Sequence, residues 1–133
     1  MFRKRGGSGA WWVLLAGLLW VSGLVAREAP APQLDAVTQV VAVAALPVQG
    51  QQVLQQIHQG GPFRYDKDGT VFGNRERLLP RQARGYYREY TVPTPGLNHR
   101  GARRIVCGGN QPKAPEACYY TADHYTSFKR IVQ

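Results

Sequence analysis

The sequence is poor in the residues that form metal sites and multi-disulfide scaffolds. Its 133 residues include two cysteines and three histidines, and only 8 acidic residues stand against 17 lysines and arginines. Two cysteines without an accompanying histidine or cysteine cluster are too few ligands for a metal site, so we expect neither a metal ion nor another cofactor. The shortage of acidic side chains favours polyanionic partners, such as nucleic acid, an anionic membrane surface or an acidic protein.

A hydrophobic run long enough to span a bilayer is also missing. The apolar stretch at 11–26 has 16 residues, whereas a spanning helix needs about 20. It follows the basic residues Arg3, Lys4 and Arg5, and this order is typical of a secretory signal. We therefore predict a signal peptide at 1–26 and a secreted protein without stable membrane association. The alternative is an uncleaved anchor, which would leave the protein periplasmic or membrane-anchored.

The remaining chain is long enough for one small domain. Residues 27–38 are rich in proline and alanine and are typical of a flexible leader. The folded domain is expected at 39–133, as a monomer with a small core. Without residues 1–26, 14 basic residues face 8 acidic ones, a formal charge of +6.

The two cysteines, Cys107 and Cys118, are separated by ten residues. Exported proteins meet an oxidising compartment, where a disulfide is preferred to a metal site or a catalytic thiol. Closing this loop would stabilise the fold by about 2–3 kcal/mol.

The pattern of apolar residues predicts an α+β domain. Residues 46–61 are expected to form a helix that places Val53, Leu54 and Ile57 on one face and stops at its closing glycines. Strands are expected at 85–92 and 103–107, followed by two more within 118–132. Sequential strands with short connections indicate one N-terminal helix packed on a twisted antiparallel β-sheet.

Three kinds of chemistry-bearing residue lie in or beside these strands. Glu89 occurs in the middle of an aromatic strand, His124 at a tight turn, and the segment "HRGARRIVCGG" carries Arg100, Arg103 and Arg104. Taken singly, each has an ordinary explanation as a solvated or ion-paired surface group. Together, a carboxylate base, an imidazole acid and guanidinium groups suit metal-free cleavage of a phosphodiester. Because the base would act on a ribose 2′-hydroxyl, the expected substrate is RNA and not DNA.

Four segments carry a family resemblance that covers roughly residues 40–132. They are "GPFRYDKDGTVFGNRERLLP", "GYYREYTVPTPG", "RGARRIVCGG" and "YYTADHYTSF". In this order and spacing they closely resemble the microbial guanyl-preferring ribonucleases of the barnase superfamily. The resemblance implies an endoribonuclease that cleaves single-stranded RNA 3′ of guanosine, first to a 2′,3′-cyclic phosphate and then by hydrolysis.

The resemblance also implies a role for each matching catalytic residue. Glu89 matches the general base and His124 the general acid. Arg100 and Arg104 match the phosphate-binding arginines, and Tyr125 matches a tyrosine near the substrate. By strand alternation Arg103 is expected to point to the opposite side of the sheet and is left out of the catalytic set.

The guanine site is expected in the segment "FGNRE", from Phe72 to Glu76. Glu76 would accept hydrogen bonds from N1 and the exocyclic amine of guanine, while backbone N–H groups around Asn74 and Arg75 would donate to O6. Stacking on an aromatic or guanidinium plane would add affinity. The alternative is an ordinary turn with a surface glutamate. Gly73 stands where relatives often carry a larger residue, which predicts a looser loop and weaker base preference.

The resemblance further implies an acidic, barstar-like protein inhibitor as a partner beside the RNA substrate. Other functions stay open on the sequence alone. The chain could be a non-catalytic RNA- or polyanion-binding module of the same fold, or a membrane-tethered or toxin form of the ribonuclease.

Overall fold

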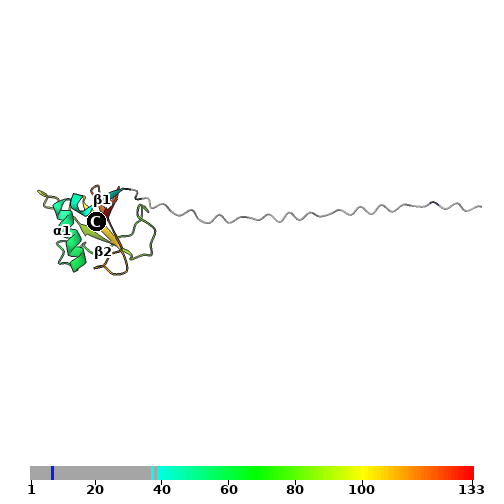
Figure 1. Ribbon diagram of the computed structural model, residues 1–133, viewed down its shortest axis with the longest axis horizontal. Helices are drawn as coiled ribbons and strands as arrows, with labels where there is room; N and C mark the ends of the chain where they lie inside the picture. The colour runs from blue at the N-terminus through cyan, green and yellow to red at the C-terminus, as the bar shows by residue number, and fades with distance from the viewer. Residues whose placement is uncertain (1–6, 8–36, 38) are drawn as a thin grey trace, which may run out of the picture. The chain divides into compact units, whose positions relative to one another are not determined.

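The computed structural model describes Gly7, Val37 and residues 39–133. The predicted signal peptide and leader therefore fall almost entirely outside the described residues. Within the part that the structure describes, no helix is both long and apolar enough to cross a membrane. The domain has one helix, a short 3-10 turn and six strands (Figure 1). In chain order these are β1 (Val40–Ala42), η1 (Val43–Ala45), α1 (Val48–Gln59), β2 (Thr70–Val71), β3 (Tyr87–Thr91), β4 (Arg104–Gly108), β5 (Ala117–Thr121) and β6 (Lys129–Val132).

The predicted helix is confirmed as α1, and its ends follow from the local sequence. Pro47 precedes the first turn, where its missing N–H would have no partner in any case. Gly60 adopts the left-handed conformation with φ of 83° and donates its N–H to the carbonyl of Ile57 at 3.2 Å. The N–H of Gly61 reaches the carbonyl of Gln56 at 2.9 Å. These bonds satisfy carbonyls of the last turn and end the helix.

The six strands form one sheet in the order β1-β6-β5-β4-β3-β2. Every neighbouring pair is antiparallel except β1 and β6, which run parallel at one edge. The predicted strands correspond to β3, β4, β5 and β6. The two edge strands β1 and β2 were not predicted, because segments of three and two mostly exposed residues carry too little periodicity to identify.

Side-chain alternation gives the sheet two faces with different contents. The helix α1 lies against the sheet (Figure 1). On that face Val53, Leu54 and Ile57 pack with strand residues that include Ile105. A second cluster covers the opposite face and is formed by Leu79, Tyr87, Val106, Tyr119 and Phe128. Strand register places Glu89 opposite Val106. The candidate base therefore projects from the face that α1 leaves uncovered.

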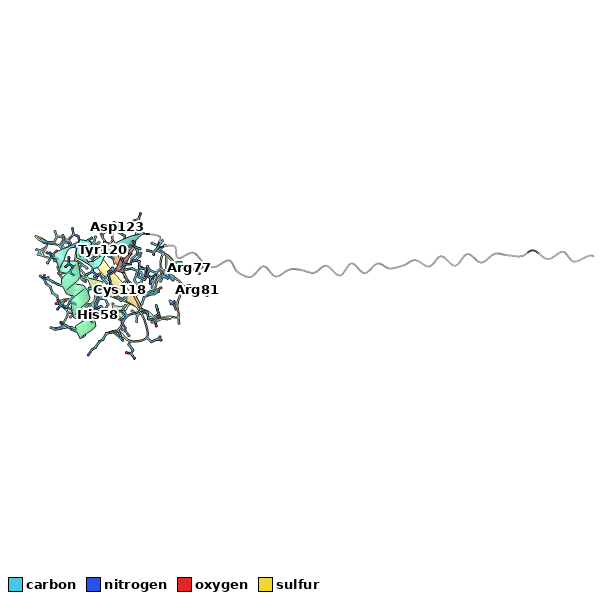
Figure 2. All side chains as sticks on the ribbon, in the orientation of Figure 1. His58, Arg77, Arg81, Cys118, Tyr120 and Asp123 are labelled. Carbon is cyan, nitrogen blue, oxygen red and sulfur yellow. A yellow bond between two sulfur atoms is a disulfide. The ribbon has the colours of Figure 1, made fainter. Side chains whose placement is uncertain are left out.

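Cys107 and Cys118 form the predicted disulfide. They are register partners on the adjacent strands β4 and β5, with their Cα atoms 4.1 Å apart. Both side chains are buried in the cluster beneath α1, and Figure 2 labels Cys118 within the domain near the helix. The disulfide thus belongs to the structural face of the sheet.

Candidate active site

The structure brings Glu89, Arg100 and Tyr125 into direct contact. One carboxylate oxygen of Glu89 lies 3.4 Å from Nη2 of Arg100, with 15% of the glutamate side chain and 28% of the arginine side chain exposed. The other oxygen accepts a hydrogen bond of 2.8 Å from the Tyr125 hydroxyl. A partly exposed carboxylate held from two sides has a fixed orientation, as a general base requires.

Arg104 lies on β4, behind the contacts made by Tyr125. It is 2% exposed, and Nη1 and Nε of its guanidinium group donate directed hydrogen bonds. Nη1 donates to the carbonyls of Arg103 and Gly101 at 2.8 and 3.0 Å, and Nε donates to the Tyr125 hydroxyl at 3.1 Å. These bonds compensate for burying the charge. They leave a positive potential beneath the position where a phosphoryl group would lie.

Two buried threonines lie beside Arg104 and hold the neighbouring groups. Thr91 and Thr121 are its register partners on β3 and β5, so the three residues form a row across the sheet. Thr91 accepts a hydrogen bond of 3.0 Å from Nε of Arg100. Thr121 accepts one of 3.2 Å from the backbone N–H of Tyr125. The row therefore fixes both an arginine and the loop that carries the candidate acid.

That loop, residues 122–128, connects β5 to β6 and presents His124 to solvent. His124 and Tyr125 both have positive φ angles, 53° and 69°, which cost energy for residues other than glycine. The N–H of His124 donates to the carbonyl of Ala102 at 3.0 Å. Asp123 accepts hydrogen bonds from Thr121 and Ser127. These hydrogen bonds thus hold the loop in a conformation that its residues disfavour in isolation.

The predicted guanine segment forms a loop whose backbone donors are free. The side-chain amide of Asn74 bonds both the N–H and the carbonyl of Leu79, at 3.1 and 2.9 Å. Asn74 therefore shapes the loop with its side chain. Across the described chain, no acceptor takes a hydrogen bond from the N–H groups of Asn74, Arg75 or Glu76. These three donors remain available to a ligand oxygen.

One cavity of about 820 Å³ is lined by both candidate catalytic residues and the guanine segment. Glu89 and His124 line it together with the loop residues Phe72 to Glu76 and with Tyr125. Phe72 stacks on Tyr125 with ring centroids 5.1 Å apart and planes 24° apart, while Arg100 and Arg104 reach the same wall through Glu89 and Tyr125. Glu89, His124 and the predicted substrate-binding residues thus share one volume suited to a nucleotide, whereas Arg100 and Arg104 lie behind its wall and do not line it.

The pKa of Tyr125 is shifted by its surroundings. Burial raises its pKa above 10, and the hydrogen bond to Glu89 and the negative charge of that carboxylate raise it further. The phenol therefore stays protonated at neutral pH and can donate a hydrogen bond. Among the residues that the structure describes, no three His, Cys, Asp or Glu side chains are grouped as metal ligands.

Comparison with known proteins assigns the family. The sequence model of the family described as ribonuclease matches residues 29–132. The chain belongs to the ribonuclease family. It is 48% identical to guanyl-specific ribonuclease Sa of Kitasatospora aureofaciens over 73% of this chain and 97% of that protein. It is 54% identical to guanyl-specific ribonuclease Sa3 of the same organism, over 68% of this chain and 62% of that longer protein.

Solved structures agree with this ribonuclease in fold. A structure of ribonuclease Sa2 in complex with mononucleotides superposes with a TM-score of 0.66 at 44% identity, covering 71% of this chain and 94% of that one. A structure of ribonuclease Sa2 with guanosine-2′-cyclophosphate gives a TM-score of 0.64, also at 44% identity, over 71% and 95% of the two chains. The α+β fold with one helix on a mostly antiparallel sheet is therefore confirmed.

Sequence reasoning did not find the residues that hold the site in place. Thr91, Thr121 and Asp123 were not predicted, and Tyr125 was expected only near the substrate. Strand alternation gave a partial signal, because Thr91 shares a face with Glu89 in the sequence "YREYT". The bonds made by Thr121 and Asp123 depend on the turn geometry, which the sequence does not reveal.

Proposed function

We propose that this ribonuclease is an endoribonuclease that cleaves single-stranded RNA on the 3′ side of guanosine through a 2′,3′-cyclic phosphate. The observation that carries the proposal is that Glu89 and His124 line one cavity with the guanine segment. The relatives named as guanyl-specific ribonucleases support the same activity. The carboxylate, the imidazole and the guanidinium groups supply each chemical function, so the mechanism needs no metal ion.

In the first step Glu89 takes the proton of the ribose 2′-hydroxyl, and the resulting oxygen attacks the phosphorus. His124 gives a proton to the departing 5′-oxygen. Arg100 lies beside Glu89 and Arg104 lies under Tyr125, so both guanidinium groups can stabilise the charge that develops on the phosphoryl oxygens. In the second step the roles reverse, because His124 activates water and Glu89 returns a proton to the 2′-oxygen.

Tyr125 has two roles in this scheme. Its hydroxyl donates to Glu89 and accepts from Arg104 in the free enzyme. Since the raised pKa keeps the phenol protonated, it can donate to a phosphoryl oxygen once Glu89 has turned to the 2′-hydroxyl. Tyr125 therefore links the base to the phosphate-binding arginine.

Base selection comes from the segment Phe72 to Glu76. The free N–H groups around Asn74 and Arg75 would donate to O6 of guanine, and the Glu76 carboxylate would accept from N1 and the exocyclic amine. Adenine carries an amine at position 6 and lacks the N1 proton, so both sets of contacts would fail. A base missing these partners loses a large part of the binding energy because polar groups of the site stay unpaired.

Digestion of an oligonucleotide with a single guanosine tests this function. We expect one cut, giving an upstream fragment that ends first in a guanosine 2′,3′-cyclic phosphate and later in a 3′-phosphate. The downstream fragment should begin with a 5′-hydroxyl, and a 2′-deoxyguanosine at the same position should prevent cleavage. An RNA that is bound but left intact would identify a binding module and contradict the proposal.

Export and an inhibitor complete the proposal. The basic segment and apolar run at 1–26 support secretion of a monomeric enzyme, and the positive charge supports an acidic, barstar-like inhibitor that covers the site. N-terminal sequencing of protein recovered outside the cell should find a start after residue 26. A start at Met1 in a membrane fraction would indicate the tethered form. A barstar-like protein that forms no complex at low salt would remove the inhibitor from the proposal.

A further inference from the structure

A dense group of arginines follows the guanine segment directly. The sequence "RERLLPRQAR" at 75–84 contains four arginines and one glutamate. The four, Arg75, Arg77, Arg81 and Arg84, are called the arginine rim below. All four are exposed. Figure 2 labels Arg77 and Arg81 at one margin of the domain, away from His58 on α1.

No arginine of the rim is held in an ion pair in the described part of the chain. Within residues 39–133 the ion pair that the structure contains joins Arg100 to Glu89, and no rim guanidinium donates a hydrogen bond to a protein acceptor. Four like charges within ten residues repel one another and attract anions. Bound phosphates would supply the missing counter-charge and release the condensed counterions of RNA.

A second cavity lies next to this rim. It measures about 480 Å³ and is bounded by residues 71–75 on one side and by Gln82, Ala83, Arg84 and Tyr87 on the other. Residues 71–75 also line the larger catalytic cavity, so the guanine segment is the wall between the two. The volume suits one nucleotide unit, and Arg75 and Arg84 supply positive charge on its two sides.

The position of this second cavity decides which part of the RNA can reach it. His124 must face the departing 5′-oxygen, so the RNA downstream of the cut leaves on the side of His124. The second cavity is lined neither by His124 nor by Glu89 but adjoins the segment that would hold the guanine base. The strand attached to the 5′-oxygen of that guanosine would therefore pass over residues 71–75.

We propose that the second cavity is a subsite for the nucleotide on the 5′ side of the cleaved guanosine, and that Arg84 in its wall binds the phosphate. Arg81 is exposed in the same segment without lining the cavity and adds positive charge beside it. This inference rests on the proposed function and adds a preference for substrates that continue upstream. It predicts that RNA with several nucleotides before the guanosine is a better substrate than the dinucleotide GpC.

The test compares kcat/KM for UpUpUpGpC with kcat/KM for GpC. In the wild-type enzyme we expect the ratio of the two to exceed one at low salt. It should fall roughly threefold for each phosphate contact when salt rises from about 50 to about 200 mM. In Arg84→Gln, and more fully in the double variant Arg81→Gln/Arg84→Gln, the ratio should approach one and lose its dependence on salt. A 3′ extension, as in GpCpUpU, should confer a benefit that these substitutions leave unchanged.

Arg130→Gln is the matched control, because it removes one exposed arginine charge from β6 at a position that lines neither cavity. It should retain the wild-type ratio.

A ratio of one in the wild-type enzyme, or a ratio above one that survives in the double variant, would overturn the proposed subsite while leaving cleavage of GpC intact. If no guanosine-containing RNA is cleaved at all, the proposed function itself fails. If the double variant keeps its ratio but loses binding to phosphatidylserine vesicles, the rim serves a membrane surface and the subsite is wrong.

Discussion

At the scale of single residues, Tyr125 decides how the charges of the site are arranged. Its hydroxyl stands between the Glu89 carboxylate and the Arg104 guanidinium, at 2.8 and 3.1 Å. A direct contact between the carboxylate and Arg104 would hold the base in a strong ion pair. The phenol separates the two charges by one neutral group. Glu89 therefore stays oriented without a direct bond to Arg104.

Glu89→Gln tests the base. The amide keeps the size of the side chain but takes no proton from the 2′-hydroxyl, so kcat for cyclisation should fall by about 10²- to 10⁴-fold. RNA binding should change little, because the phosphate-binding arginines are kept. Stopped-flow turnover and a binding titration with uncleavable 2′-deoxy substrate measure the two effects. Glu116→Gln removes an exposed carboxylate outside the catalytic cavity and should retain full turnover; equal activity in both variants would remove Glu89 from its role.

His124→Ala tests the acid through the leaving group. Ordinary RNA leaves as a poor alkoxide and needs the proton, whereas a nitrophenolate leaves readily without one. Cleavage of RNA should therefore drop by about 10²-fold or more, and cleavage of a guanosine 3′-nitrophenyl phosphate should drop far less. Parallel rate measurements on the two substrates give the comparison. Equal losses on both would assign His124 a purely structural part.

Tyr86 supplies a test in alkaline solution. Its hydroxyl donates to Glu116 at 2.6 Å, and this hydrogen bond, followed by burial, raises its pKa from 10.0 to about 12. The stabilisation from this raised pKa is complete below pH 10 and is lost as pH rises through 12. Glu116→Gln should shift one tyrosine midpoint back toward 10 in an absorbance titration, and Tyr86→Phe should delete that same midpoint. A midpoint unmoved by Glu116→Gln would show that the bond does not control the titration.

At the scale of elements, the loop between β5 and β6 is the least regular part of the site and the one that most needs support. Two consecutive left-handed residues, His124 and Tyr125, occupy it. Asp123 binds Thr121 before them and Ser127 after them, closing the loop at both ends. The hydrogen bond from Ser127 lowers the pKa of Asp123 below 3.8. The stabilisation of the fold by the Asp123 carboxylate is therefore present above pH 3.8 and is lost as acid protonates the carboxylate.

Asp123→Ala should free this loop. We expect a loss of about 1–2 kcal/mol in unfolding free energy from the missing hydrogen bonds and a fall in kcat that exceeds the change in KM, because the acid loses its position. The stability difference from wild type should shrink as pH falls below 3.8. Urea denaturation at two pH values and steady-state kinetics measure these effects. Asp66→Ala removes an exposed carboxylate without a side-chain hydrogen bond and serves as control. An identical stability loss in both variants at neutral pH would contradict the bracing role.

Elements with strong periodicity could be predicted from the sequence, and elements without it could not. The helix has a regular apolar face and a double-glycine stop, and β3 to β5 are rich in aromatic and β-branched residues. By contrast, Val40–Ala42 becomes a strand only because β6 offers a parallel partner, which is a long-range property. Within the site, residue types and order predicted a candidate acid, a candidate base and two arginines, and their roles stay predictions. The supports at Thr121 and Asp123 arise from turn geometry and were invisible in the linear pattern.

At the scale of the whole molecule, the sheet separates stability from chemistry. The face under α1 carries the disulfide and the cluster around Ile57 and Ile105. The opposite face carries Glu89 and the cavity. A change to one face can therefore alter folding without altering the arrangement of the catalytic groups.

The pair Cys107→Ala/Cys118→Ala tests this separation. Opening the cross-link should lower the unfolding free energy by about 2–3 kcal/mol, with kcat/KM at room temperature unchanged. Urea midpoints of the variant and the oxidised wild type measure the loss, and Arg130→Gln should show neither effect. A large drop in activity under conditions where the variant remains folded would show that the two faces are coupled.

The parallel pairing of β1 with β6 has a consequence for the order in which the fold assembles. Among the described strands β1 comes first in the chain and β6 last, so this edge of the sheet stays open until residues 129–132 have paired. The loop with His124 precedes β6 and has a single anchored end during that interval. The candidate acid therefore acquires its fixed position only when β6 has joined the sheet.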